Sequence, residues 1–261
     1  MDASVNRPLE GRVALVTGAG GGIGRDLACA LGAAGAHVGI AVRRIETGEE
    51  TANLISAEGG PRSLVIRMDM TDHASIAAGV AALAGEFGAV DIIIQNAAAP
   101  DSAYPMSADV TDEVAWRRQA DITLGGTLVL AQAGHPHLKA SGQGRFIVMT
   151  SNFGYHGAAM NAIYSTTKAS LRGFIKSLAR EWGPDRITVN AISPAAATPP
   201  TRVFFSQYPA MEAAYRRKFA LGTLGDPRRD IGEGAVALCA GYLGFMTGQT
   251  LFLDGGLFPS A

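Results

Sequence analysis

Residues 13–24 read Val13-Ala14-Leu15-Val16-Thr17-Gly18-Ala19-Gly20-Gly21-Gly22-Ile23-Gly24, an apolar run followed by a turn rich in glycine. The apolar run is typical of a buried β-strand, and the residues that follow it, through Gly32, are typical of a helix. Glycine permits positive φ and close approach of the backbone to a ligand, and a helix N-terminus directs N–H groups at an anion. This order of strand, turn and helix therefore indicates a site for the diphosphate of a dinucleotide.

The same alternation of strand and helix patterns continues along the chain. Further strands are predicted at residues 38–42, 63–67, 92–95, 146–150, 188–192 and 249–253, and helices at 46–58, 74–87, 113–139 and 164–182. Short apolar strands separated by segments of helix length predict a parallel sheet with helices on both faces. We therefore expect one domain over residues 1–261, with a Rossmann-like, doubly wound α/β fold of about seven strands.

One late stretch departs from this alternation. Residues 194–219 are rich in proline and aromatic side chains, and they include Phe205 and Tyr208. In doubly wound folds, ligands bind outside the carboxyl ends of the strands, where an insertion at this place would lie. We therefore expect residues of about 195–220 to form a loop or lid over a substrate site.

The composition gives no surplus of charge for holding a polyanion. The 261 residues include 22 Lys and Arg against 23 Asp and Glu, for a formal net charge of −1. We therefore expect a small-molecule substrate, with neither nucleic acid nor a membrane as a partner. Segment 1–11 lacks the apolar core of a secretory signal, which favours a cytoplasmic protein. His135 and His137 have no Cys or Glu at ligand spacing nearby, so we expect no metal site.

A possible catalytic set lies near residue 160. Tyr164 and Lys168 are four residues apart and therefore share one face of a predicted helix. A phenol with a pKa near 10 is a poor acid–base group at neutral pH, and a fixed ammonium one turn away stabilises its phenolate. Ser151 ends a predicted strand 13 residues before Tyr164 and can donate a hydrogen bond to a substrate oxygen. These residues suit proton transfer to a carbonyl or from an alcohol.

Together, the Thr-Gly-x-x-x-Gly-x-Gly spacing of Thr17, Gly18, Gly22 and Gly24, the Tyr-x-x-x-Lys pair and the preceding serine resemble the short-chain dehydrogenase/reductase family. The tail at residues 247–256 is also similar, so the resemblance spans nearly the whole chain. It implies hydride transfer between a nicotinamide cofactor and a carbonyl or secondary alcohol. It also implies a homo-oligomer, a tetramer or possibly a dimer.

The end of the second predicted strand bears on the choice of cofactor. Relatives that use NAD carry an Asp where this chain has Val42, and here Arg43 and Arg44 follow it. An acidic residue at this place would bind the ribose 2′-OH and repel a 2′-phosphate, whereas arginine favours the phosphate. Glu46 is the nearest acid and could reach back. NADP(H) is therefore the preferred cofactor, with NAD(H) as the alternative.

The resemblance also implies further residues at the site. For the cofactor they are Gly18, Gly20, Gly22, Ile23, Gly24, Asp69, Met70, Asn96, Ala97, Tyr164, Lys168, Pro194, Ala197 and Thr198, and for the substrate they are Ser151, Phe153, His156, Phe205 and Tyr208. Thr123 occupies the place of a family Asn in a proton relay to the lysine, and we expect this change to be tolerated. The alternatives are an NAD-dependent alcohol dehydrogenase and a non-redox relative, either halohydrin-lyase-like or nucleotide-sensing.

Overall fold

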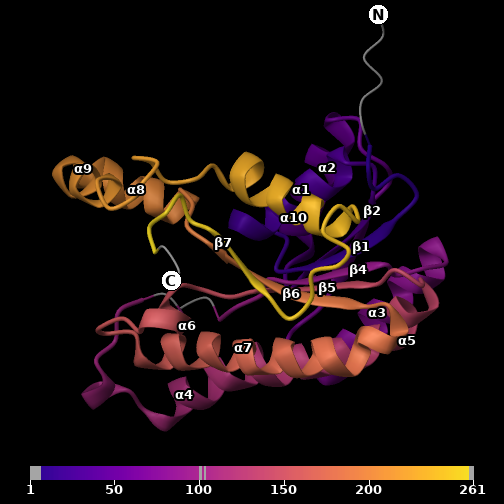
Figure 1. The fold of residues 1–261 in the computed structure, drawn as a ribbon, viewed down its shortest axis with the longest axis horizontal. Helices are drawn as coiled ribbons and strands as arrows, with labels where there is room; N and C mark the ends of the chain where they lie inside the picture. Colours follow the sequence, from indigo (N-terminus) through magenta and orange to yellow (C-terminus); the bar gives the residue numbers. More distant parts are fainter. Residues whose placement is uncertain (1–6, 100–101, 103, 259–261) are drawn as a thin grey trace, which may run out of the picture.

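Seven parallel strands form a single sheet in the order β3-β2-β1-β4-β5-β6-β7. The computed structural model describes residues 7–99, 102 and 104–258 (Figure 1). The strands are β1 (Val13–Thr17), β2 (His37–Val42), β3 (Leu64–Arg67), β4 (Ile92–Gln95), β5 (Arg145–Met149), β6 (Thr188–Pro194) and β7 (Thr250–Leu253). The strand order reverses between β1 and β4, where a doubly wound sheet opens a crevice for its ligand. The expected fold class is confirmed.

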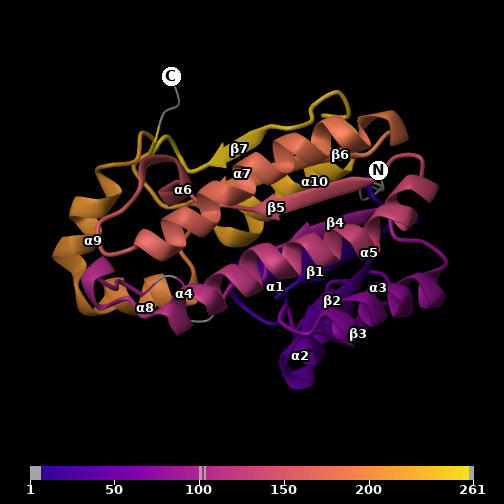
Figure 2. The same ribbon diagram turned by 90° about the horizontal axis from the view of Figure 1, so that it is seen from below.

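Helices cover both faces of this sheet (Figures 1 and 2). One face carries α1 (Gly22–Ala33), α2 (Ile45–Ala57) and α10 (Glu233–Cys239), and the other carries α3 (His73–Phe87), α5 (Gly126–Ala140) and α7 (Ala162–Trp182). The strands alternate their side chains between the two resulting cores, so that Val16 and Ile40 pack on one face and Leu15 and Ile93 on the other. Such a sheet, buried on both faces, needs the nearly continuous apolar strands seen in the sequence.

The predicted helix over residues 113–139 is interrupted. It divides into α4 (Glu113–Ala120), a π-helical turn η2 (Asp121–Gly125) and α5. The wider turn places the consecutive residues Ile122 and Thr123 both in the interior. Just beyond it, the chain passes so near the segment after β3 that a Cβ on Gly126 would lie 2.6 Å from the Met70 carbonyl oxygen. Because π-turns often occur at functional sites, this one marks the segment for attention.

The late proline-rich stretch contains two helices, α8 (Pro199–Gln207) and α9 (Pro209–Arg216). A backbone bridge between Ala196 and Gly225 joins the two ends of this segment. The short helices α8, α9 and α6 (Phe153–His156) lie toward the same end of the molecule (Figures 1 and 2). Three further helical turns complete the described chain, η1 (Ala108–Val110), η3 (Gly183–Asp185) and η4 (Pro227–Gly232). Within the described residues, no helix is long and apolar enough to cross a bilayer.

Candidate active site

The glycine turn after β1 is shaped by close backbone contacts. Gly18 and Gly22 have φ of +67° and +53°, a region that favours glycine. A Cβ on Gly24 would lie 2.5 Å from Asn96 Nδ2 and still nearer to the Gly18 carbonyl oxygen. Asn96 Nδ2 donates a 3.0 Å hydrogen bond to the Thr17 carbonyl oxygen, which joins the end of β4 to the turn. The turn is therefore a cradle that larger side chains would fill.

Side chains from α1 and α2 hold the backbone of this cradle by hydrogen bonds. Arg25 donates a 2.7 Å hydrogen bond to the Gly20 carbonyl oxygen and pairs with Glu50 at 2.5 Å. Its Nε also donates to Thr51 Oγ1, whose hydroxyl in turn donates to the Ala19 carbonyl oxygen at 2.9 Å. The turn is thus fixed by the protein itself, through Nε and Nη2 of Arg25.

A cavity of about 300 Å³ opens against the cradle. Many of the residues predicted for the cofactor line it: Gly18, Gly20, Arg43, Arg44, Asp69, Met70, Asn96 and Ala97. Arg43 and Arg44 are exposed and enter no ion pair with Glu46 or any other described residue. Arg43 lies near Asp69, whose carboxylate accepts hydrogen bonds from the Thr71 amide and hydroxyl, so that the pKa of Asp69 is lowered.

Several lining residues were not predicted from the sequence, among them Thr47, Met68 and Ile122. Thr47 is one turn into α2 and donates to the Arg44 carbonyl oxygen at 2.8 Å, so it helps to place Arg44. In the sequence, the signal for Thr47 was its position just after the two arginines. The apolar walls, the cradle without side chains and the two cations fit the adenosine half of a dinucleotide.

Three further residues predicted for the cofactor, Pro194, Ala197 and Thr198, do not line this cavity but lie at the end of β6. Pro194 ends β6, and the Ala197 amide donates to the Gly225 carbonyl oxygen at 2.9 Å. The hydroxyls of Thr198 and Thr201 are 2.9 Å apart at the start of α8. These residues thus form the stem of the α8–α9 segment, outside the carboxyl end of β6.

Ser151 and Tyr164 come together beyond the end of β5. The Ser151 hydroxyl accepts a hydrogen bond from the Phe153 amide at 3.2 Å, and it also interacts with the Tyr164 hydroxyl. The Phe153 ring packs edge-on against the Tyr164 ring, with centroids 6.1 Å apart. Burial raises the pKa of Tyr164, and the hydrogen bond with Ser151 lowers it by less. The phenol is therefore protonated at neutral pH.

Lys168 follows this tyrosine by one helical turn along α7. Its side chain is buried, and Nζ donates a 2.7 Å hydrogen bond to the Met149 carbonyl oxygen. Nζ is also 5.8 Å from the centroid of the Tyr164 ring. Burial lowers the pKa of Lys168 from 10.5 to about 8. The ammonium is therefore fixed by β5 while it faces the tyrosine, and at pH 7 it is still mostly charged.

Thr123 lies within the π-turn η2, which packs against α7. Its carbonyl oxygen accepts a hydrogen bond from the Thr127 hydroxyl at 2.5 Å, and its side chain is buried. At the place of the family Asn, the chain therefore has Thr123, within a π-turn that packs against the helix carrying Lys168.

The predicted substrate residues fall into separate groups. Phe153 contacts Tyr164, whereas the exposed His156 stacks on Phe258 with ring centroids 4.6 Å apart. Phe205 and Tyr208 belong to a cluster on α8 and α9, in which each contacts Phe204. In the described chain, no ring contact joins this cluster to the Phe153–Tyr164 pair. The aromatic segment therefore stands apart from the catalytic set in this conformation.

A family model described as Enoyl-(Acyl carrier protein) reductase matches residues 18–258. The chain belongs to the short-chain dehydrogenase/reductase family. It is 31% identical to cis-4-hydroxycyclohexanecarboxylate dehydrogenase of Sinomonas cyclohexanicum, over 94% of this chain and 96% of that protein. It is 34% identical to the 3-oxoacyl-(acyl-carrier-protein) reductase FabG of Escherichia coli, over 95% of this chain and 98% of that protein.

Solved structures of family members have the same architecture. A putative short-chain alcohol dehydrogenase from Sinorhizobium meliloti superimposes with a TM-score of 0.88 and 32% identity, covering 95% of this chain and 97% of that one. A 7 alpha-hydroxysteroid dehydrogenase complexed with NADH and 7-oxo glycochenodeoxycholic acid gives a TM-score of 0.88 at 27% identity, with 98% of both chains covered. As a member of this family, the chain is an NAD(P)-dependent oxidoreductase.

Proposed function

We propose that this enzyme uses NADP(H) to interconvert a ketone and a secondary alcohol. The observation that carries the cofactor preference is the pair Arg43 and Arg44, which line the cavity of the glycine turn at the end of β2. The buried end of that strand is Val42, which leaves no carboxylate to repel a 2′-phosphate. Charged hydrogen bonds to phosphate contribute roughly 1.5–3 kcal/mol each, which is enough to set a preference.

The chemistry follows from Ser151, Tyr164 and Lys168. When bound, the nicotinamide supplies or accepts the hydride. The Ser151 hydroxyl orients the substrate oxygen beside Tyr164, and the protonated phenol donates its proton to that oxygen during reduction. Lys168 stabilises the phenolate that results and binds the ribose, and in the oxidative direction the phenolate takes the alcohol proton back.

We further propose a small substrate that is largely apolar and cyclic. Phe153 lies beside Tyr164, and the helices α8 and α9 carry the aromatic cluster outside the sheet. Apolar and aromatic walls with a few polar groups are typical of small-molecule sites. The relatives named for hydroxycyclohexanecarboxylate and for 7 alpha-hydroxysteroid act on ring-bearing alcohols, which supports the same class here. The homotetramer implied by the family stays a prediction, as does a cytoplasmic location.

A titration tests the cofactor preference without any knowledge of the substrate. The wild-type protein should bind NADPH at least about tenfold more tightly than NADH, as measured by cofactor fluorescence. Arg43→Ala should weaken NADPH binding by about the same factor and leave NADH binding nearly unchanged, because only NADPH carries the 2′-phosphate.

The matched control is Arg180→Ala, an exposed arginine on α7 outside the cavity. It should leave the dissociation constants of both cofactors unchanged. Tighter binding of NADH than of NADPH by the wild-type protein would contradict the proposal and would make NAD(H) the cofactor.

A further inference from the structure

Few positively charged side chains lie near the glycine turn, where the diphosphate of a bound dinucleotide would bind. Backbone N–H groups of the turn and of α1 can bind its oxygens. The nearest arginine, Arg25, is already engaged by the Gly20 carbonyl oxygen and by Glu50. Arg43 and Arg44 lie at the end of β2, on the adenosine side of the cavity. A cation supplied by another segment would add charged hydrogen bonds to those of the backbone N–H groups.

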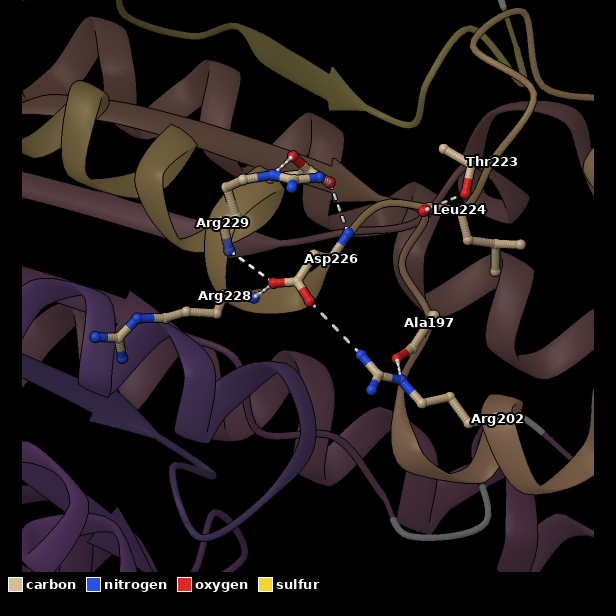
Figure 3. Close-up of polar contacts among 8 residues, drawn as sticks. Ala197, Arg202, Thr223, Leu224, Asp226, Arg228 and Arg229 are labelled. Atoms are coloured by element: carbon tan, nitrogen blue, oxygen red, sulfur yellow. Dashed lines mark hydrogen bonds and ion pairs between the residues drawn. The ribbon is translucent and has the colours of Figure 1, made fainter.

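Arg202 in the first turn of α8 is placed to be that cation. Its Nε donates a 2.8 Å hydrogen bond to the Ala197 carbonyl oxygen, which fixes the side chain at the stem of the α8–α9 segment. One terminal nitrogen, Nη2, points to Asp226 at 3.6 Å, longer than a hydrogen bond (Figure 3). The side chain is 60% exposed. Such an exposed, loose ion pair contributes little to stability and exchanges readily for a better partner.

Asp226 does not depend on Arg202 for its own position. Its Oδ1 accepts hydrogen bonds of 2.9 Å from the amides of Arg228 and Arg229, and so it caps the turn η4 (Figure 3). Its amide donates to Asp230 Oδ2 at 2.6 Å. The carboxylate is therefore held by the turn that it caps, and Arg202 can leave it without disturbing η4.

The Arg202–Asp226 pair also lies near the helix that would hold the diphosphate. The turn η4 packs against α1, whose first turns follow the glycine cradle. Asp26, four residues after Gly22, is close enough to both partners for their charges to act on its carboxyl. Burial and the Asp226 charge raise the pKa of Asp26, while Arg228 and Arg202 lower it. The packing agrees with this, since a Cβ on Gly232 of η4 would lie 3.4 Å from the Asp26 carbonyl oxygen, and Arg202 is 3.6 Å from Asp226 at the start of the same turn.

We propose that Arg202 is a binding residue for the diphosphate of the dinucleotide, and that Asp226 holds its guanidinium near the start of α1 until the cofactor enters. A guanidinium matches phosphate oxygens with two parallel hydrogen bonds, which a carboxylate 3.6 Å away does not provide here. Cofactor binding would thereby connect α8, which carries part of the aromatic cluster, to the glycine turn. This inference rests on the dinucleotide binding proposed above and is independent of the choice between NADP(H) and NAD(H).

Three ligands test the inference by equilibrium binding: NADPH, NADH and 2′-AMP, which carries adenine and the 2′-phosphate without a diphosphate. Arg202→Ala should raise the dissociation constants of NADPH and NADH by a similar factor, about tenfold or more. The constant for 2′-AMP should change by less than about twofold, because that ligand has no diphosphate for Arg202 to bind. Asp226→Asn, which keeps a capping side chain, should tighten NADPH binding because it releases Arg202.

The matched control is Arg229→Ala, which removes an exposed arginine of the same turn that pairs with Asp230 instead. It should leave all three constants unchanged, and thermal unfolding should show that every variant is folded. Unchanged NADPH binding by Arg202→Ala, or an equal loss for 2′-AMP, would overturn the inference. A wild-type preference for NADH would overturn only the proposed cofactor preference, whereas failure to bind any dinucleotide would overturn both.

Discussion

Lys168 carries a charge that its surroundings disfavour. Burial lowers its pKa from 10.5 to about 8, so between these pH values the unfolded chain binds a proton that the folded enzyme does not. The cost of the buried ammonium is therefore fully present below about pH 8 and is lost as the pH rises toward 10.5. A shift of this size corresponds to about 3 kcal/mol, part of which the hydrogen bond to Met149 offsets.

Lys168→Met should for this reason separate stability from activity. At pH 7 we expect the variant to have a free energy of unfolding about 1–3 kcal/mol above that of the wild type, and turnover at least about a hundredfold lower. The gain should shrink between pH 8 and 10.5. Denaturant unfolding at several pH values checks this, with the exposed Lys176→Met on the same helix as the control. A variant less stable than the wild type at pH 7 would contradict the account.

At the scale of the residue, the sequence predicted which side chains lie together, but it did not predict how their surroundings shift their pKa values. The spacing of Ser151, Tyr164 and Lys168 placed them at one edge of the sheet, because the fold brings a strand end and the following helix together. The spacing did not reveal that burial raises the pKa of Tyr164 by more than the hydrogen bond with Ser151 lowers it. Burial depends on the side chains of the whole molecule, which spacing alone does not reveal.

At the scale of the element, the packing of the glycine turn predicts the effect of a substitution at Gly24 on NADPH binding. Gly24→Ala would bring a Cβ to within 2.5 Å of Asn96 Nδ2 and closer to the Gly18 carbonyl oxygen, which are held by the hydrogen bonds of the cradle. The turn must shift, and we expect NADPH binding to weaken by at least about a hundredfold, because the diphosphate depends on the close approach of this backbone.

The control for this prediction is Gly173→Ala in α7, where a Cβ meets nothing within 4 Å. It should leave NADPH binding unchanged and stabilise the fold by about 0.5–1 kcal/mol, since glycine is unfavourable inside a helix. Equal NADPH affinity for Gly24→Ala and the wild type would show that the turn does not bind the diphosphate.

The elements that could be predicted were those with strong local signals. Apolar β-rich runs ended by glycine or polar residues gave the strands to within a few residues, as with β1 and β4. The π-turn η2 was not predicted, because it depends on packing against α7 and on the approach of Gly126 to Met70, which lie far apart in sequence. The helices α8 and α9 were expected only as a loop or lid, because prolines and exposed aromatic residues gave no clear helical period.

At the scale of the whole molecule, the two parts of the candidate site lie at the ends of different strands of the sheet. The glycine turn, Arg43 and Arg44 lie on the cavity at the ends of β1 and β2, whereas the catalytic set lies beyond β5. The segment α8–α9 extends from the end of β6, joined at its base by the bridge between Ala196 and Gly225.

We expect this enzyme to reduce a ketone with NADPH through the phenol of Tyr164. NADPH oxidation should be followed by absorbance with a set of cyclic ketones, for the wild type and for Tyr164→Phe. The wild type should turn over at least one ketone, and the variant should lose about 10²–10⁴-fold in kcat, with the dissociation constant of NADPH nearly unchanged. Full activity of Tyr164→Phe, or no turnover of any ketone by wild-type protein that binds NADPH, would contradict it.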